Sequence, residues 1–379
     1  MLKKWRGCAA WCCLVLLSAL TMPAYAQEQG HFYGMLRSRD LTPFGFLRLD
    51  MRPAHALNIE SHTFAFETEL GYQNTWALSE NVEKYLTALE ASGRREIGPA
   101  EIEEIQNLPG ENYLLDVESA TLDVAMHYKI SSQWSVYAIA TAVSYHGGFM
   151  DSGIEHFHDA VGLSSFGRKA FAQNGTHLIY DLKGARVVLS EAPKSPGFLD
   201  PTFGLRYSGI TLPGKWQMSI ETAIKWAFDG ARPLLSTGRD DYGMQVSLRR
   251  LGSKNALLVD LSGVYYAGED LPSPHDAQVV PTIVIGWERV MTARTNLNLQ
   301  LYASTSVYGH DQTDLDELLT EKYQMSLGVR HRFDCCLVSF AVTENLQNLY
   351  NTPDIGFQFG FAWVPRLIGA GPGNRENSN

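Results

Sequence analysis

Two histidines and two carboxylates that could ligate a metal lie close together in the chain, at Glu155, His156, His158 and Asp159. On a helix, residues three apart share a face, so Glu155 would lie beside His158 and His156 beside Asp159. Such pairs could hold a divalent ion. The interpretation that we favour is a loop helix whose charged groups cap it and hydrogen-bond to neighbouring loops, with Arg168 nearby. The metal content of this cluster stays open.

A second set of ionisable residues occupies alternate positions of segments with a period of two, and such positions share one face of a strand. The set comprises Glu67, Glu69, Asp123, His127, Lys129, Arg206, Glu221, Lys225, Arg249, Asp260, Glu288 and Arg330. If this face lines a barrel, Glu67, Glu69 and Asp123 could form an acidic wall that attracts cations. Lys129 or an incoming cation would relieve their repulsion. Alternatively, opposite charges meet across a narrow lumen and close it.

Signals for catalysis are weak along the whole chain. The sequence contains no metal motif of recognised spacing and no Gly-x-Ser-x-Gly turn. We therefore assign no catalytic residue and expect no cofactor. An enzyme that acts on envelope lipid remains an alternative function.

The elements that must position these residues are strands. In the clearest one, Asp354–Trp363, four aromatics and Ile355 alternate with Gly, Gln and Ala, which predicts one aromatic face and one small or polar face. Eleven more strands are predicted at Thr63–Trp76, Leu114–Ile130, Trp134–Tyr145, Thr202–Ile210, Trp216–Phe228, Tyr242–Arg249, Leu257–Tyr265, Val279–Trp287, Thr295–Tyr308, Tyr323–Phe333 and Cys335–Thr343. A membrane barrel turns the apolar face to lipid and the polar face to its lumen. The predicted fold class is an all-β, antiparallel transmembrane β-barrel of about twelve strands, and a secreted β-sandwich is the alternative.

The connectors between these segments support the strand count. Connectors after even-numbered strands are short and those after odd-numbered strands are longer and polar, as expected for periplasmic turns and outer loops. Two long loops, 77–112 and 146–201, are predicted to carry a short helix at Asn81–Ala91 and a hairpin at His177–Ser190. In the register of strand two Glu118 would face lipid, so we place it above the membrane on an extended hairpin. The tryptophans after the leader fall at or near strand ends, as an aromatic girdle requires: Trp76, Trp134, Trp216, Trp226, Trp287 and Trp363.

The chain divides into four parts. Basic residues precede a short apolar run and Ala24-Tyr25-Ala26, which is typical of a secretory signal peptide over residues 1–26. Residues 27–62 form an N-terminal segment that is periplasmic or enters the lumen, with an extra strand as the alternative. Residues 63–364 form the outer-membrane barrel and 365–379 a C-terminal tail. The aromatic terminal strand resembles the signal by which barrels are recognised for insertion, so the barrel-assembly machinery is an expected partner.

Charge and cysteine usage narrow the partners further. The formal net charge of −10 argues against nucleic acid, which requires a basic face. Expected partners are outer-membrane lipid and a small solute. After the leader only Cys335 and Cys336 remain. Adjacent strand residues point to opposite faces, which would strain a disulfide, so we expect two free cysteines shielded by lipid.

Three local patterns carry a family resemblance: Arg39-Asp-Leu-Thr-Pro-Phe-Gly45, Gly148-Phe-Met-Asp-Ser-Gly-Ile-Glu-His-Phe-His158 and Asp200-Pro-Thr-Phe-Gly-Leu-Arg-Tyr207. With them the chain resembles a family of uncharacterised Gram-negative envelope proteins, domain of unknown function 3187. The resemblance covers most of the mature chain. It implies an outer-membrane barrel and implies no substrate.

The function that we predict is a porin-like passive channel for small solutes in the cell outer membrane. An outer-membrane enzyme acting on lipid and a closed structural or adhesive barrel are the alternatives. A channel needs a continuous wet path, whereas an enzyme needs a nucleophile or a metal near the outer rim and a scaffold needs neither.

Overall fold

Twelve long strands close into a β-barrel in the computed structural model of the chain, which describes residues 32–39, 45–52, 60–183, 185–190, 196–228, 230–267, 277–347 and 354–363. The barrel strands are β1 (Phe64–Leu78), β2 (Asn112–Lys129), β3 (Trp134–His146), β7 (Thr202–Leu212), β8 (Trp216–Lys225), β9 (Asp241–Leu251), β10 (Asn255–Tyr266), β11 (Gln278–Val290), β12 (Thr295–Ser304), β13 (Lys322–Arg332), β14 (Cys336–Gln347) and β15 (Ile355–Trp363). Each strand pairs antiparallel with its neighbours, and β1 pairs with both β2 and β15. The predicted fold class is therefore confirmed.

The two faces of each barrel strand differ as the alternation predicts. On β1, Phe66 and Leu70 are 42% and 50% exposed, whereas Glu67 between them is 6% exposed. The same pattern on β2 leaves Val124 exposed beside the buried Asp123. Outward side chains are mostly large and apolar, so the outer wall suits lipid and the polar groups are left to the lumen.

One end of the barrel has short turns and the other has long connections. The turns at 130–133, 213–215, 252–254, 291–294 and 333–335 define the short-turn end. The connections at 79–111, 147–201, 226–240, 267–277, 305–321 and 348–354 define the long-connector end. The predicted alternation of connector lengths is confirmed.

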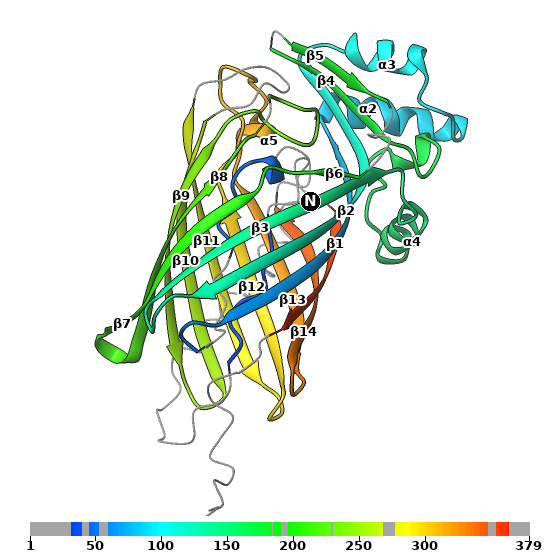
Figure 1. Cartoon of the computed structure of the whole chain (residues 1–379). Helices are drawn as coiled ribbons and strands as arrows, with labels where there is room; N and C mark the ends of the chain where they lie inside the picture. Colours follow the sequence, from blue (N-terminus) through cyan, green and yellow to red (C-terminus); the bar gives the residue numbers. More distant parts are fainter. Residues whose placement is uncertain are drawn as a thin grey trace, which may run out of the picture.

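The two longest connections build an outer cap on one side of the long-connector end (Figure 1). The cap consists of α2 (Glu80–Leu89), η2 (Glu90–Ser92), α3 (Pro99–Gln106), α4 (Asp151–Val161), η3 (Arg168–Ala170), β4 (His177–Leu182) and β5 (Ala185–Leu189). The helix and hairpin predicted in these connections are present, whereas α3 was not predicted. Leu86, Ile105 and Phe171 pack with Trp76 in a small core beneath the cap. None of the described helices is long and apolar enough to cross a membrane.

The cap corrects the placement of two side chains. Trp76 is 4% exposed and lies beneath the cap, so it does not belong to a lipid-facing girdle. Glu118 lies toward the long-connector end of β2, and the cap buries it completely. Its carboxylate accepts backbone N–H bonds from Phe149 (3.1 Å) and Met150 (2.7 Å). Gly148 permits this approach, because a Cβ there would lie 1.8 Å from the Glu118 carboxyl carbon.

Several predicted strand ends are too long or too short. β8 ends at Lys225 rather than Phe228, because the N–H of Ala227 donates to Oδ1 of Asp240 instead of to β7. β12 ends at Ser304 rather than Tyr308, whose ring is buried among other side chains at the barrel mouth. Of the two free cysteines, Cys336 is buried but Cys335 is exposed in the turn before β14, so lipid does not shield both.

The barrel interior is filled in two different ways. At the long-connector end an apolar cluster lines the mouth; it includes Tyr113, Tyr145, Tyr180, Tyr266 and Tyr308. The remaining short elements are η1 (Gly45–Leu47), η4 (Pro213–Lys215), β6 (Gly197–Phe198) and α5 (Asp316–Leu319). Further down, residues 32–39 and 45–52, here called the N-terminal lumen segment, lie against the inward faces of the strands. This segment adds no strand to the barrel.

Candidate functional site

The acidic side chains of β1 and β2 are paired with arginines of the N-terminal lumen segment. Nη1 of Arg37 lies 3.3 Å from Oε2 of Glu67. Asp123 receives two arginines, with Nη1 of Arg39 at 3.4 Å and Nη1 of Arg52 at 2.6 Å. These side chains are almost fully buried, so each charge needs its partner. The predicted wall is thus neutralised by a part of the same chain.

Glu69 completes the acidic wall but Lys129 does not. Glu69 stands directly opposite Asp123 in the β1–β2 ladder, as predicted. Lys129 lies six residues further along β2, about 20 Å from Asp123 at strand spacing, so its charge cannot relieve the wall. Its Nζ instead donates to Oγ of Ser208 at 3.3 Å. The expectation that Lys129 pairs with the wall is therefore wrong.

The N-terminal lumen segment is also held through its backbone. The N–H groups of Tyr33 and Gly34 donate to the two carboxylate oxygens of Glu288, at 2.8 and 3.0 Å. Arg330 donates to the carbonyl of Tyr33 at 2.6 Å, and Asn298 to that of Gly34 at 2.9 Å. Glu288 of β11 and Arg330 of β13 thus bind the same stretch of extended chain.

Lys225 and Asp241 hold the other end of the N-terminal lumen segment. Nζ of Lys225 lies 2.9 Å from the carbonyl oxygen of Leu47 and 3.0 Å from Oδ2 of Asp241. The same Asp241 oxygen accepts the N–H of Leu49 at 2.8 Å. Arg48 reaches across to the hydroxyl of Tyr302 at 2.7 Å. Strands on opposite sides of the barrel therefore all contact this segment.

Glu221 of β8 binds two inward side chains, one from β3 and one from β7. Its Oε2 accepts Nε of Arg206 at 2.5 Å, and its Oε1 accepts the hydroxyl of Tyr137 at 2.6 Å. His127 lies on the neighbouring β2, with Nε2 3.6 Å from Oε1 of Glu67. Among the inward candidates, Arg206 thus pairs with Glu221, and His127 lies beside Glu67.

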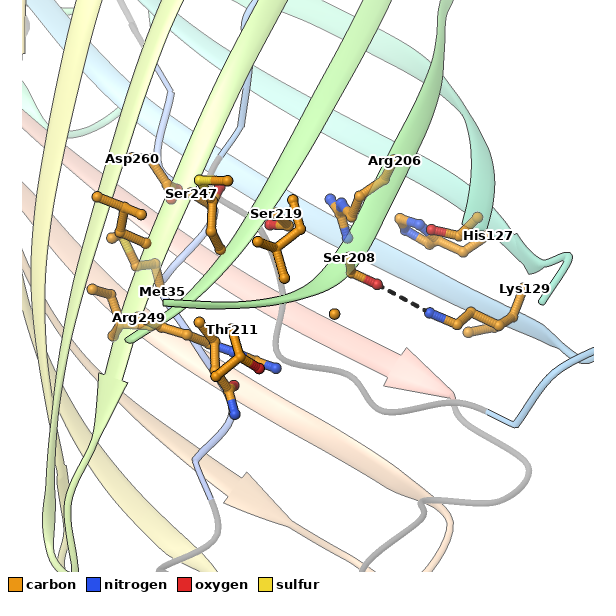
Figure 2. Close-up of a pocket in the computed structure, with 18 of the residues that line it drawn as sticks. Met35, His127, Lys129, Arg206, Ser208, Thr211, Ser219, Ser247, Arg249 and Asp260 are labelled. Atoms are coloured by element: carbon orange, nitrogen blue, oxygen red, sulfur yellow. Dashed lines mark hydrogen bonds between the residues drawn. The ribbon is translucent and has the colours of Figure 1, made fainter. Parts of the chain in front are cut away.

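A cavity of about 200 Å³ opens below these pairs, at the short-turn end. Lys129, Arg206 and Arg249 line it together with Ser208, and we call it the basic cavity. Figure 2 shows Lys129 and Arg249 entering it from different strands, with the Lys129–Ser208 hydrogen bond drawn. The charges of Arg206 and Arg249 both act on Lys129. Three cations therefore lie near one another in the cavity, whose lining also includes the carboxylates of Glu67 and Asp260.

A β-bulge shapes the basic cavity. The pairing of β7 with β8 shifts register between Tyr207 and Ile210, and Gly209 within the shift has φ +97°. That backbone conformation favours glycine. Ser208 shares the inward face of β7 with Arg206, two residues earlier, and the bulge bends β7 at this point. The sequence pattern of β7 did not reveal it.

The cluster of Glu155, His156, His158 and Asp159 lies on α4, but its side chains do not converge on one point. Glu155 is buried and lies within 2.9 Å of Nε2 of Gln173, and it also pairs with Arg94. His158 bonds the carbonyl of Ser164 through Nδ1 at 3.0 Å. These contacts fit the interpretation of a helix bonded to neighbouring loops.

The other two members of the cluster face solvent. Asp159 accepts Nζ of Lys169 at 2.6 Å, and this hydrogen bond lowers the pKa of Asp159 and raises that of Lys169 from their ordinary values. His156 is exposed. Among the described residues, no group of three or more His, Cys, Asp or Glu is arranged to hold a metal ion.

Arg168 belongs to a different network from the rest of the cluster. It is 3% exposed, donates to Oδ1 of Asp151 at 2.6 Å and to Oδ1 of Asn74 at 3.1 Å, and pairs with Asp354. Its guanidinium carbon lies 4.9 Å from the ring centroid of Trp76. The side chain therefore ties the outer cap to β1 and to the start of β15.

The arginines of the N-terminal lumen segment are the functional residues that the sequence analysis did not select. They carry no local motif, and their partners are up to 254 residues away in the chain. A signal was available, because this segment has more Arg than Asp while the predicted inward face is rich in carboxylates. Charge complementarity between the segment and the inward face could have predicted that the segment lies in the lumen.

Comparison with known families agrees with this architecture. Residues 105–363, from the outer cap to the end of β15, match the profile described as "Protein of unknown function (DUF3187)". The chain belongs to this family. The description of this family assigns no activity to its members. A search of curated proteins found no match.

Solved structures similar to this DUF3187 protein are outer-membrane barrels. The COG4313 outer membrane channel from Pseudomonas putida F1 has a TM-score of 0.49 and 8% identity, covering 81% of this chain and 97% of that one. The NanC porin has a TM-score of 0.39 and 8% identity, with 79% and 98% covered. The P. putida toluene transporter TodX has a TM-score of 0.36 and 9% identity, with 79% and 90% covered. These likenesses concern the barrel fold and say nothing about the solute.

Proposed function

We propose that this DUF3187 protein is an outer-membrane channel for small solutes that its own N-terminal lumen segment closes in the present conformation. The observation that carries the proposal is the composition of the lumen. Its inward positions hold carboxylates, guanidinium groups and amides that bind a separate stretch of chain through polar contacts. Such a surface can be wetted when the segment moves, whereas an apolar core cannot.

The outer wall supports a membrane location. Large apolar side chains of the barrel strands are exposed outward, and every turn at one end is short. This asymmetry suits a barrel with its long-connector end at the cell surface. The leader over residues 1–26 and the tail over 365–379 lie outside the described residues, so secretion by the leader is part of the proposal.

Planar bilayer recording tests the channel. The purified parent is compared with a triple variant, Arg37→Gln, Arg39→Gln and Arg52→Gln, which removes the cations that hold the segment to Glu67 and Asp123. We expect larger or longer openings in the variant, because the segment loses its ion pairs. Arg186→Gln is the control, since Arg186 pairs with Asp181 in the exposed hairpin of the outer cap. Absence of current through both folded proteins would contradict the channel.

A closed scaffold is the second candidate, and the apolar cluster at the long-connector end favours it. That cluster packs residues from β2, β3, β4 and β10 across the mouth, which a permanently closed barrel would also need. Conductance in the triple variant argues against the scaffold. A triple variant that stays silent while its barrel resists heat like the parent argues for it.

A further inference from the structure

The basic cavity contains two cations without a carboxylate partner among the described residues. Among the described residues, the Lys129 ammonium donates only to the neutral hydroxyl of Ser208. Arg249 has neither an ion pair nor a hydrogen bond there, and the charge that acts on it is that of Arg206. Arg206 is already paired with Glu221. Two cations without a carboxylate partner in a cavity attract anions from solution.

The carboxylates of the basic cavity are already engaged elsewhere. Glu67 is paired with Arg37 of the N-terminal lumen segment and stands near His127. Asp260 is 4% exposed and also has an interaction partner. Neither carboxylate forms an ion pair with Lys129 or Arg249 among the described residues. Lys129 and Arg249 thus have no carboxylate partner among the described residues.

The geometry of the basic cavity suits a small molecule. Lys129 and Arg249 are partly exposed and come from different strands, β2 and β9 (Figure 2). Hydroxyl and amide groups of Ser135, Ser219 and Gln217 also line the wall. Guanidinium and ammonium groups with neutral hydrogen-bonding neighbours are the usual partners of a carboxylate or phosphate. A volume of about 200 Å³ admits only a compact solute.

We propose that the basic cavity binds a small solute through an oxyanion, a carboxylate or phosphate group, with Arg249 and Lys129 as its charged partners. Arg249 supplies a planar pair of donors and Lys129 a point charge. Ser208, on the inward face of β7, orients the Lys129 ammonium. That this anion is the transported solute rests on the proposed channel function, whereas binding itself does not.

Calorimetric titration of the full chain in detergent micelles at low ionic strength tests the site. Three probes are used: succinate, inorganic phosphate and the uncharged succinamide. We expect saturable binding of succinate or phosphate and none of succinamide; which anion binds more tightly identifies the group. Added salt should weaken binding, because the charges are partly exposed.

Three variants locate the binding. Arg249→Gln and Lys129→Gln should each raise the Kd by about tenfold, because each removes one charge-assisted hydrogen bond. Arg250→Gln is the matched control, since Arg250 is the next residue of β9 and is exposed on the outer face. It removes the same charge from the protein without touching the cavity, so its Kd should equal that of the parent.

Two outcomes would overturn the site. One is the absence of saturable binding of both anions to the folded parent. The other is equal weakening by Arg249→Gln and Arg250→Gln, which would assign binding to the general charge of the protein. Conductance measured on the same preparations separates the two proposals. Binding without current supports the site and contradicts the channel, and current without binding does the reverse.

Discussion

Arg52 and Asp123 meet inside the barrel, with 2.6 Å between Nη1 and Oδ2, although one residue precedes the first strand and the other lies on the second. Both side chains are about 5% exposed. The pair therefore joins the N-terminal lumen segment to the barrel wall through two buried charges, and each is costly without the other. Of the ion pairs that Arg37, Arg39 and Arg52 form with the acidic wall, this one is the shortest.

The first prediction concerns this pair. Asp123→Asn should lower the free energy of unfolding by about 3–5 kcal/mol, because it removes the carboxylate with which the buried Arg39 and Arg52 form their ion pairs. Adding Arg52→Gln should restore part of the loss, since residues in contact are not additive. Urea unfolding in detergent micelles measures both. Thr141→Val is the control: it removes only a neutral donor to Asp123, so about 1 kcal/mol is expected. If Asp123→Asn is as stable as Thr141→Val, the ion-pair account is contradicted.

The second prediction concerns the outer cap. Arg168→Met keeps the length of the side chain but leaves Asp151 and Asp354 without their cation. We expect faster hydrogen exchange throughout α2 and α4, because the cap loses its tie to β1. Lys169→Gln is the control, since its pair with Asp159 is exposed and contributes little. Equal protection in the two variants would show that Arg168 does not hold the cap.

The third prediction is the orientation of the barrel. Ser164 and Ala231 are exposed residues of the long connections, so Ser164→Cys and Ala231→Cys should react with an impermeant maleimide on intact cells. Ser236, in the same connection as Ala231, is unsuitable because it is 2% exposed and bonded to Asp200. The exposed Cys335 in a short turn supplies an internal control that should react only after the outer membrane is opened. The reverse order of reactivity would invert the topology.

The fourth prediction concerns insertion. Phe361 and Trp363 are 39% and 40% exposed on the terminal strand, which closes the barrel between β14 and β1. Phe361→Ala and Trp363→Ala should reduce the fraction of folded, heat-modifiable protein in the membrane fraction. Trp363 also contacts Phe66 of β1, with ring centroids 6.0 Å apart. Phe157→Ala removes a comparable exposed ring from α4 and should insert normally. If all three variants insert alike, the terminal strand has no special role in assembly.

The sequence by itself determined the barrel. In Asp354–Trp363 and Thr63–Trp76 the alternation of large apolar and small or polar residues assigns each side chain to the wall or the lumen, because strand geometry has a period of two. The connector lengths then determined which strands are neighbours. Local patterns of this kind need no knowledge of distant contacts.

Only the tertiary structure decided what fills the lumen. The partners of Glu67 and Asp123 are arginines without a local pattern, and only closure of the barrel brings them together. The same holds for Lys129 and Arg249, which are far apart in the chain and line one cavity beside the bulge in β7 that alternation conceals. The inward direction of a side chain follows from local strand geometry. The partner of its charge depends on which segments the closure of the barrel places opposite it.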